Sequence, residues 1–180
     1  MPSSLETALA PETLPEDSAG LCVLVVEDDE ADAYLISRAL AAQPAVGMVV
    51  RAPDGVAALG MVERGEVTPD LAFIDLHMPR KNGFNLLAAF AARADHAFPM
   101  VVLTSSTAPT DAIRSRLRGA MRVVTKPDTL EAMDSVLAFA IAAACPSGTR
   151  PALARRIKAR AIRPKTNGFP GIHAAAIDER

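Results

Sequence analysis

The sequence predicts an α/β fold in which a parallel β-sheet carries helices on both of its faces. Five short apolar segments alternate along the chain with five segments whose apolar residues have helical spacing. Segments 21–26 and 71–74 are apolar at every position, which is typical of strands buried on both sides of a sheet. Four of the five segments end in polar residues, and the carboxyl ends of parallel strands are where ligands bind in such folds.

The first strand is expected at 21–26, followed directly by the three acids Glu27-Asp28-Asp29. A helix is expected over 31–43, because Pro44 cannot continue it. Its inward face is expected to carry Leu35, Ala39 and Leu40.

A second strand is expected at 46–50. Asp54 can cap a helix over 56–64, and Gly65 ends that helix. The third strand, 71–74, is the most central one expected.

Asn82 is expected to cap the third helix, after which a fourth strand covers 98–103. A short helix over 109–118 ends at Gly119. The residues expected to share one face of the third helix are Phe84, Leu87, Ala88 and Ala91.

The last strand is expected at 121–125 and the last helix over 129–144. We expect three parts in the chain: an acidic, proline-containing leader at 1–20, one folded domain at 21–145 and a basic extension at 146–180. The last helix is expected to bury Leu130, Met133, Leu137, Ala140 and Ile141.

Composition narrows the class of protein. A formal net charge of −2 over 180 residues creates no field that favours nucleic acid or membrane, so neither is expected as a partner. Cys22 and Cys145 lack metal-ligand spacing and fit a reducing compartment. The longest apolar segment, 136–145, is too short to span a bilayer, and the N-terminus lacks a secretion signal. We therefore expect a cytoplasmic protein.

Polar side chains from four strand ends are expected to meet at one edge of the sheet: Glu27, Asp28, Asp75, Thr104 and Lys126. Clustered carboxylates favour a hard divalent cation, and Mg²⁺ commonly uses one or two carboxylates together with phosphate and water. A carboxylate nucleophile can accept a phosphoryl group, whose oxygens require positive charge and hydroxyl donors. The arrangement predicts a phosphorylation site with Asp75 as acceptor.

Two segments, Val-Glu-Asp-Asp-Glu-Ala-Asp-Ala at 26–33 and Asp-Leu-His-Met-Pro-Arg-Lys-Asn-Gly at 75–83, resemble the receiver domain of two-component response regulators. The resemblance covers about 21–144 and is greatest to stand-alone, phytochrome-associated receivers. It implies a flavodoxin-like (βα)5 doubly wound sheet with strand order 2-1-3-4-5.

The resemblance also implies roles for the acids. Asp75 would be the phosphoacceptor. Asp28 would bind the metal directly and Glu27 would bind it through water. His77 lies where the family's backbone carbonyl binds the metal, so its imidazole has no implied role.

On the other side of the site, Thr104 would contact the phosphoryl group and Lys126 would pair with Asp75 or its phosphate. Pro127 resembles the family's cis-proline, which can set the direction of that lysine. Val123 departs from the family, which usually has an aromatic residue there that moves inward on phosphorylation. The resemblance therefore leaves the switch pair Thr104 and Val123 without its usual aromatic member.

The function that the resemblance implies is a single-domain response regulator and not an enzyme. Its partners would be a sensor histidine kinase or phosphotransfer protein, a downstream protein target and, as one route for output, a second copy in a homodimer.

Three alternatives have different requirements. A pseudo-receiver would bind partners without phosphorylation, and Val123 leaves room for that hypothesis. A phosphohydrolase of the haloacid dehalogenase kind needs an acid two residues after its nucleophile, where this chain has His77. A flavodoxin-type FMN carrier needs a phosphate-binding loop after the first strand, where this chain has acids.

Overall fold

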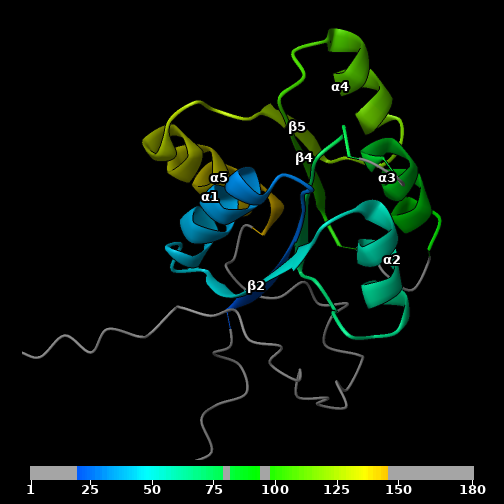
Figure 1. Cartoon of the computed structure of the whole chain (residues 1–180), viewed down its shortest axis with the longest axis horizontal. Coiled ribbons are helices and arrows are strands. Elements are labelled where there is room, and N and C mark those ends of the chain that lie inside the picture. The colour runs from blue at the N-terminus through cyan, green and yellow to red at the C-terminus, as the bar shows by residue number, and fades with distance from the viewer. Residues whose placement is uncertain (1–19, 79–81, 94–97, 146–180) are drawn as a thin grey trace, which may run out of the picture.

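A computed structural model of the chain describes residues 20–78, 82–93 and 98–145. It contains one five-stranded parallel sheet with the order β2-β1-β3-β4-β5, as predicted (Figure 1). The strands are β1 Leu21–Val26, β2 Val46–Ala52, β3 Leu71–Ile74, β4 Met100–Thr104 and β5 Arg122–Thr125. The helices are α1 Glu30–Ala41, α2 Gly55–Glu63, α3 Gly83–Ala91, α4 Pro109–Arg116 and α5 Leu130–Ala144.

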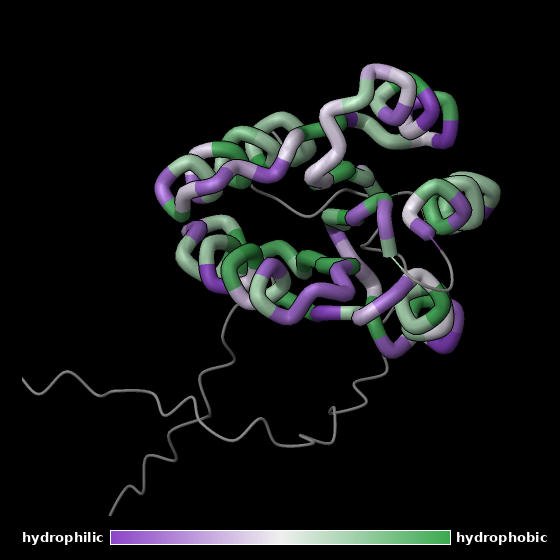
Figure 2. The backbone as a smooth tube through the Cα atoms, turned by 45° about the horizontal axis from the view of Figure 1, so that its top comes forward, coloured by the Kyte–Doolittle hydropathy of each residue, from purple (hydrophilic) through white to green (hydrophobic). Residues whose placement is uncertain are grey.

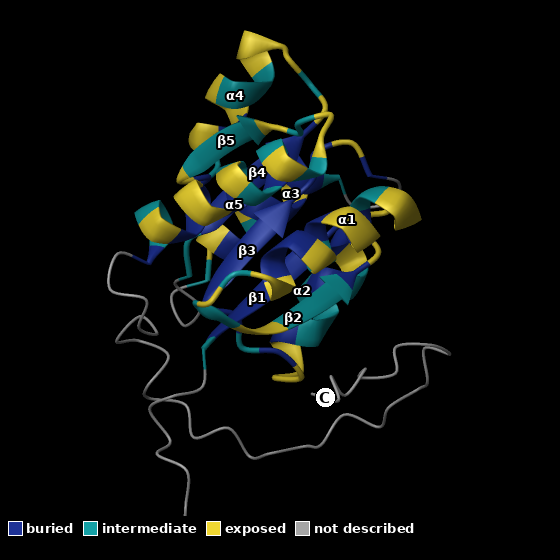
Figure 3. Ribbon diagram, turned by 90° about the vertical axis from the view of Figure 1, so that its left-hand side faces the viewer, coloured by how far each residue is buried: buried dark blue, intermediate teal, exposed yellow. Residues whose placement is uncertain are grey.

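The sheet separates two layers of helices. In Figure 1, α1 and α5 lie on one side and α2, α3 and α4 on the other. Alternate residues of β1 face opposite layers: Val23 and Val25 pack with α1 and α5, whereas Leu24 and Val26 pack with α2 and α3. The strands, drawn mostly in hydrophobic colours in Figure 2, lie between these layers. In Figure 3, β1 and β3 are buried, while the edge strand β2 is more exposed. The sheet thus separates two hydrophobic cores, one on each of its faces.

Side-chain caps start four of the five helices, and two of these caps were predicted. Asp54 accepts hydrogen bonds from the first N–H groups of α2, and Asn82 accepts one in α3. Asp29 and Thr129 cap α1 and α5 in the same way. After α2 and α4 the chain reverses at Gly65 (φ +66°) and Gly119 (φ +96°), backbone angles that glycine adopts readily.

Two predicted helix faces were partly wrong. In α1, Leu35 is 39% exposed, because the buried face is formed by Ala33, Ile36, Ala39 and Leu40. In α3, Ala88 and Ala91 are exposed, because the larger side chains Phe84, Leu86, Leu87 and Phe90 occupy the core. Burial of the larger side chains decides the rotation of a helix about its axis, since they remove more apolar area from water.

Helix α4 is attached more lightly than the other helices. Of its eight residues only Ser115 is buried, and no side chain caps its first turn. Its Arg114 guanidinium stacks 4.1 Å from the centroid of the Phe84 ring on α3. Arg118, just beyond α4, lies 5.8 Å from the same ring. The attachment of α4 therefore depends largely on amphipathic side chains at the surface.

The predicted leader at 1–20, apart from Gly20, and the predicted extension at 146–180 lie outside the described residues. Within the part of the chain that the structure describes, no helix is both long enough and apolar enough to cross a membrane.

Candidate functional site

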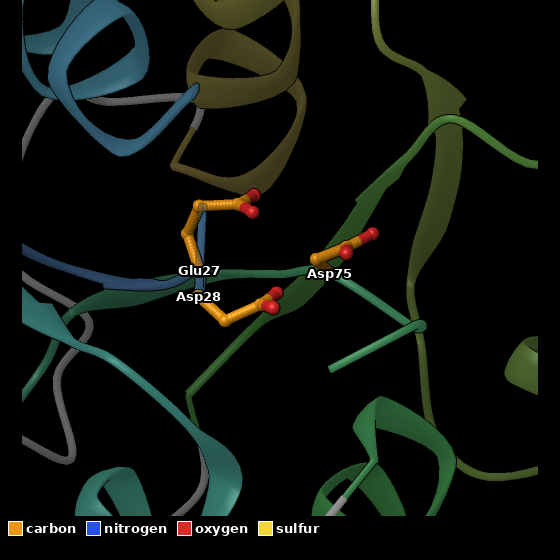
Figure 4. Close-up of side chains that lie close together, drawn as sticks. All are labelled: Glu27, Asp28 and Asp75. Carbon is orange, nitrogen blue, oxygen red and sulfur yellow. The ribbon is translucent and has the colours of Figure 1, made fainter. Parts of the chain in front are cut away.

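Three carboxylates meet at the carboxyl edge of the sheet. Glu27 and Asp28 follow β1, and Asp75 follows β3, the neighbouring strand. Each offers one oxygen to a group whose atoms all lie within 4.8 Å of one another. Figure 4 shows Glu27 and Asp28 extending from the end of β1 toward the side on which Asp75 lies. The parallel register of β1 with β3 produces this meeting, because it brings both strand ends to the same level.

Asp75 is buried and incompletely satisfied. Its backbone N–H donates to the Val26 carbonyl over 3.0 Å, which continues the ladder between β1 and β3. Its Oδ1 atom is buried and receives no hydrogen bond from any described residue. Burying a carboxylate oxygen that has no hydrogen-bond donor costs free energy, so a cation or another electrophile bound there would stabilise it.

This donor set fits a magnesium ion. Three clustered carboxylates, one with an unpartnered oxygen, supply the hard oxygen ligands that Mg²⁺ prefers. Asp28 is the most exposed of the three, which leaves room for water in the coordination shell.

Lys126 enters the site from the end of β5. Its Nζ lies 2.7 Å from Glu27 Oε2, 2.7 Å from Asp32 Oδ2 and 3.9 Å from Asp75 Oδ2. Its nearest partners are therefore Glu27 and Asp32, while the predicted partner Asp75 lies farther away. Sequence reasoning missed Asp32, because an acid in the first turn of a helix is ordinarily explained by the helix dipole.

Burial and ion pairing shift the pKa values of Glu27 and Lys126. Burial raises the pKa of Glu27 above 4.5, and this outweighs the lowering effects of the hydrogen bond and charge of Lys126. Burial lowers the pKa of Lys126, but hydrogen bonds to Asp32 and Glu27 outweigh it, so the pKa lies above 10.5. Lys126 is therefore held as a cation at neutral pH.

Arg51 on β2 contacts the backbone of the neighbouring acids Glu27 and Asp28. Its guanidinium donates to the backbone carbonyls of Glu27 and Asp28 over 3.3 Å and pairs with Glu30 over 2.9 Å. The Asp29 N–H also donates to the Glu27 carboxylate over 3.2 Å. Sequence reasoning missed Arg51, because nothing in a strand sequence indicates which carbonyls a long side chain will reach.

The hydroxyl of Thr104, at the end of β4, begins a chain of contacts that leads into α4. Thr104 is buried, and its Oγ1 accepts a hydrogen bond from the Ser106 N–H over 3.2 Å. The Ser106 hydroxyl donates to Asp111 Oδ2 over 2.6 Å. The same Asp111 oxygen lies 3.7 Å from Nε2 of His77, whose side chain is 60% exposed. The His77 imidazole therefore faces α4 and solvent.

The expectation of a cis peptide bond before Pro127 is wrong: no cis bond occurs within residues 20–78, 82–93 and 98–145. The Nζ atom of Lys126 instead has its nearest contacts with the carboxylates of Glu27 and Asp32. Val123 is half-buried and packs against the core on the α2 and α3 side, so an aliphatic side chain occupies the switch position.

The chain matches less than half of the length of some of its relatives. This chain is 33% identical to protein-glutamate methylesterase/protein-glutamine glutaminase 2 of Anaeromyxobacter dehalogenans over 105 residues. The matched residues make up 58% of this chain. The match spans only 30% of the length of that protein. Response regulator Rcp1 of Synechocystis is 33% identical over 99 residues, which covers 52% of this chain and 67% of Rcp1.

Two solved structures agree with the fold over nearly their whole length. The Mn²⁺-bound form of Rcp1 superposes with a TM-score of 0.65 at 28% identity and covers 73% of this chain and 99% of its own. The phosphorylated cyanobacterial phytochrome response regulator RcpA superposes with a TM-score of 0.67 at 27% identity and covers 74% and 99%. The family model described as the response regulator receiver domain matches residues 23–138, well over half of the chain. The chain therefore belongs to the response regulator receiver domain family.

Proposed function

We propose that this receiver accepts a phosphoryl group from the phosphohistidine of a partner kinase onto Asp75. The observation that carries the proposal is the buried, unpartnered Oδ1 of Asp75 beside two further carboxylates and a lysine. In the transfer, an Asp75 oxygen attacks phosphorus, an O–P bond forms, and the P–N bond breaks with its electron pair leaving on the imidazole nitrogen. Hydrolysis by water later returns the carboxylate and inorganic phosphate.

The residues around Asp75 have separate tasks in this proposal. Glu27 and Asp28 would hold Mg²⁺ together with Asp75, and the His77 backbone carbonyl remains a predicted further ligand. When bound, the ion would neutralise negative charge on the phosphoryl oxygens. Lys126 supplies a fixed positive charge, and the Thr104 hydroxyl can donate to a phosphoryl oxygen while it still accepts from Ser106.

The output of such a receiver is proposed to be a protein contact. We take 21–145 as the signalling unit, between the leader and the basic extension. Phosphorylation would bias the position of α4 through Thr104, with Val123 in place of an aromatic switch residue. The readers of that change would be a downstream protein or a second copy of the chain. Because the ATP that charges a histidine kinase is cytoplasmic, we place the reaction in the cytoplasm.

The test is incorporation of a phosphoryl group from acetyl phosphate, measured by intact mass, with Mg²⁺ and with a chelator. We expect one phosphoryl group on the wild type with Mg²⁺, and none with the chelator or in Asp75→Asn. Asp128→Asn, which removes an exposed carboxylate two residues beyond Lys126, is the matched control and should be phosphorylated normally.

Two outcomes would contradict the proposal. An adduct that persists in Asp75→Asn would place the acceptor elsewhere. A folded wild type that takes no phosphoryl group from acetyl phosphate, from phosphoramidate or from a charged histidine kinase would support the pseudo-receiver instead.

A further inference from the structure

Asp32, on the first turn of α1, contacts the lysine of the phosphorylation site. We propose that Asp32 is a positioning residue for phosphotransfer: together with Glu27 it aims the free N–H of Lys126 at the phosphoryl group on Asp75. The inference rests on the proposed function, since it assigns a task to a residue that touches neither the acceptor nor the predicted metal ligands.

The geometry at Nζ gives the argument its first step. A lysine ammonium group has three N–H donors in a tetrahedral arrangement. Asp32 accepts a hydrogen bond from Nζ over 2.7 Å, and Glu27 forms an ion pair with Nζ at the same distance, so both carboxylates engage the ammonium group. The remaining anionic neighbour is Asp75, whose Oδ2 lies 3.9 Å from Nζ. That gap is too long for a hydrogen bond to Asp75 itself, but a phosphoryl oxygen on Asp75 would extend into it.

Two carboxylates are needed because one cannot fix the direction of an ammonium group. Lysine has a flexible four-carbon stem and a point charge, so a single hydrogen bond leaves Nζ free to rotate about that bond. With Glu27 on one side and Asp32 on the other, rotation of the ammonium group would break an ion pair.

Asp32 is itself held in place. Its backbone N–H, with that of Ala31, donates to the Asp29 cap over 2.9 Å, which fixes the first turn of α1. Its side chain is 39% exposed, whereas those of Lys126 and Glu27 are 9% and 2% exposed. Asp32 thus reaches the buried lysine from the rim of the site, where its removal leaves no cavity in the core.

The experiment measures the rate of phosphorylation by acetyl phosphate at saturating and subsaturating Mg²⁺ in wild type and Asp32→Asn. We expect the maximal rate to fall by about tenfold, since misplacement of a catalytic group by less than 1 Å is enough for such a loss. The Mg²⁺ concentration at half-maximal rate should stay unchanged, because Asp32 is not one of the three clustered carboxylates.

A double-mutant cycle separates positioning of Lys126 from a merely structural role. In a Lys126→Met background, Asp32→Asn should cause no further loss, because the group that it positions is absent. Glu131→Gln is the matched control: it also removes an exposed acid from the first turn of a helix, here α5, and Glu131 is not one of the residues assigned to the site. Its maximal rate should equal that of the wild type. Thermal melts check folding, and Asp32→Ala provides a second variant should Asp32→Asn unfold.

The outcomes are distinguishable. If the wild type takes no phosphoryl group, the proposed function fails. If the wild type is phosphorylated on Asp75 and Asp32→Asn keeps its maximal rate, the inference alone is overturned. An equal loss from Asp32→Asn in the wild-type and Lys126→Met backgrounds would also overturn it, since Asp32 would then act without the lysine.

Discussion

Replacing Gly83 by alanine tests how closely α3 approaches the acceptor strand. Gly83 is the first residue of α3, and its N–H donates to the Leu76 carbonyl over 3.1 Å. An added Cβ would lie 2.8 Å from the Leu76 Cα and 2.9 Å from the Asp75 carbonyl carbon, and against the Asp75 carbonyl oxygen. Ordinary carbon–carbon contacts are about 3.5–4.0 Å, so the backbone after Asp75 must retreat by roughly 0.7 Å or more.

We expect Gly83→Ala to lower the free energy of unfolding by about 3 kcal/mol, the upper end of ordinary overpacking costs. The cost is high because the added Cβ would meet backbone atoms of Asp75 and Leu76, which cannot move aside as a side chain can. The gain in helix propensity, at most about 1 kcal/mol, does not offset this. The midpoint of urea unfolding followed by circular dichroism should fall by about 1 M or slightly more. Phosphorylation of Asp75 should also slow, because the displaced backbone carries the acceptor.

Gly60→Ala is the matched control. A Cβ at Gly60 would meet only the end of the flexible Arg64 side chain, 2.7 Å away, within α2. This variant should be as stable as the wild type or more stable by about 0.5 kcal/mol. If Gly83→Ala unfolds at the wild-type urea concentration, the close approach of α3 to the acceptor strand is wrong.

Two further predictions concern the cap of α2 and the last cysteine. Asp54→Ala should cost about 1–2 kcal/mol of stability in urea unfolding, because the N–H groups of Val56 and Ala57 lose a buried acceptor. Asp54→Asn keeps an acceptor oxygen and should lose less stability. Equal losses in the two variants would contradict the capping role. Burial and then the charge of Asp70 raise the pKa of the Cys145 thiol above 9.0, so the unfolded thiol ionises first and stability falls as pH rises past 9. Relative to Cys145→Ser, the wild type should therefore lose stability in urea titrations as the pH rises through 9, and a constant difference would contradict the raised pKa.

Much of this architecture could be predicted from sequence because its signals are local. Strands 21–26 and 71–74 are apolar throughout, and their observed bounds agree with the prediction. Asp54 and Asn82 cap their helices through hydrogen bonds within three residues. The carboxylate cluster followed from topology, because parallel strands bring the ends of β1 and β3 to one edge.

The missed features depend on contacts between residues far apart in the chain. Asp32 and Lys126 are separated by 94 residues, and Arg51 reaches the Glu27 carbonyl across 24. No periodicity encodes which long side chain will bridge such a separation. The phase of α1, which exposes Leu35, depends similarly on packing against α5 and the sheet. Family resemblance supplied the expected cis bond before Pro127, and local geometry did not reproduce it.

The light attachment of α4 has a consequence for how much free energy a signal requires. Inverting a two-state equilibrium from 1:99 to 99:1 takes about 5.5 kcal/mol of differential interaction. Helix α4 buries only one serine and packs an arginine on the Phe84 ring, so we expect it to open more readily than the sheet. Its alternative positions should therefore differ in free energy by less than this amount. Amide hydrogens of α4 should exchange with solvent well before those of β1 and β3. In the proposed function, a single phosphoryl group on the rigid strand β3 would therefore reset the position of this lightly attached neighbouring helix.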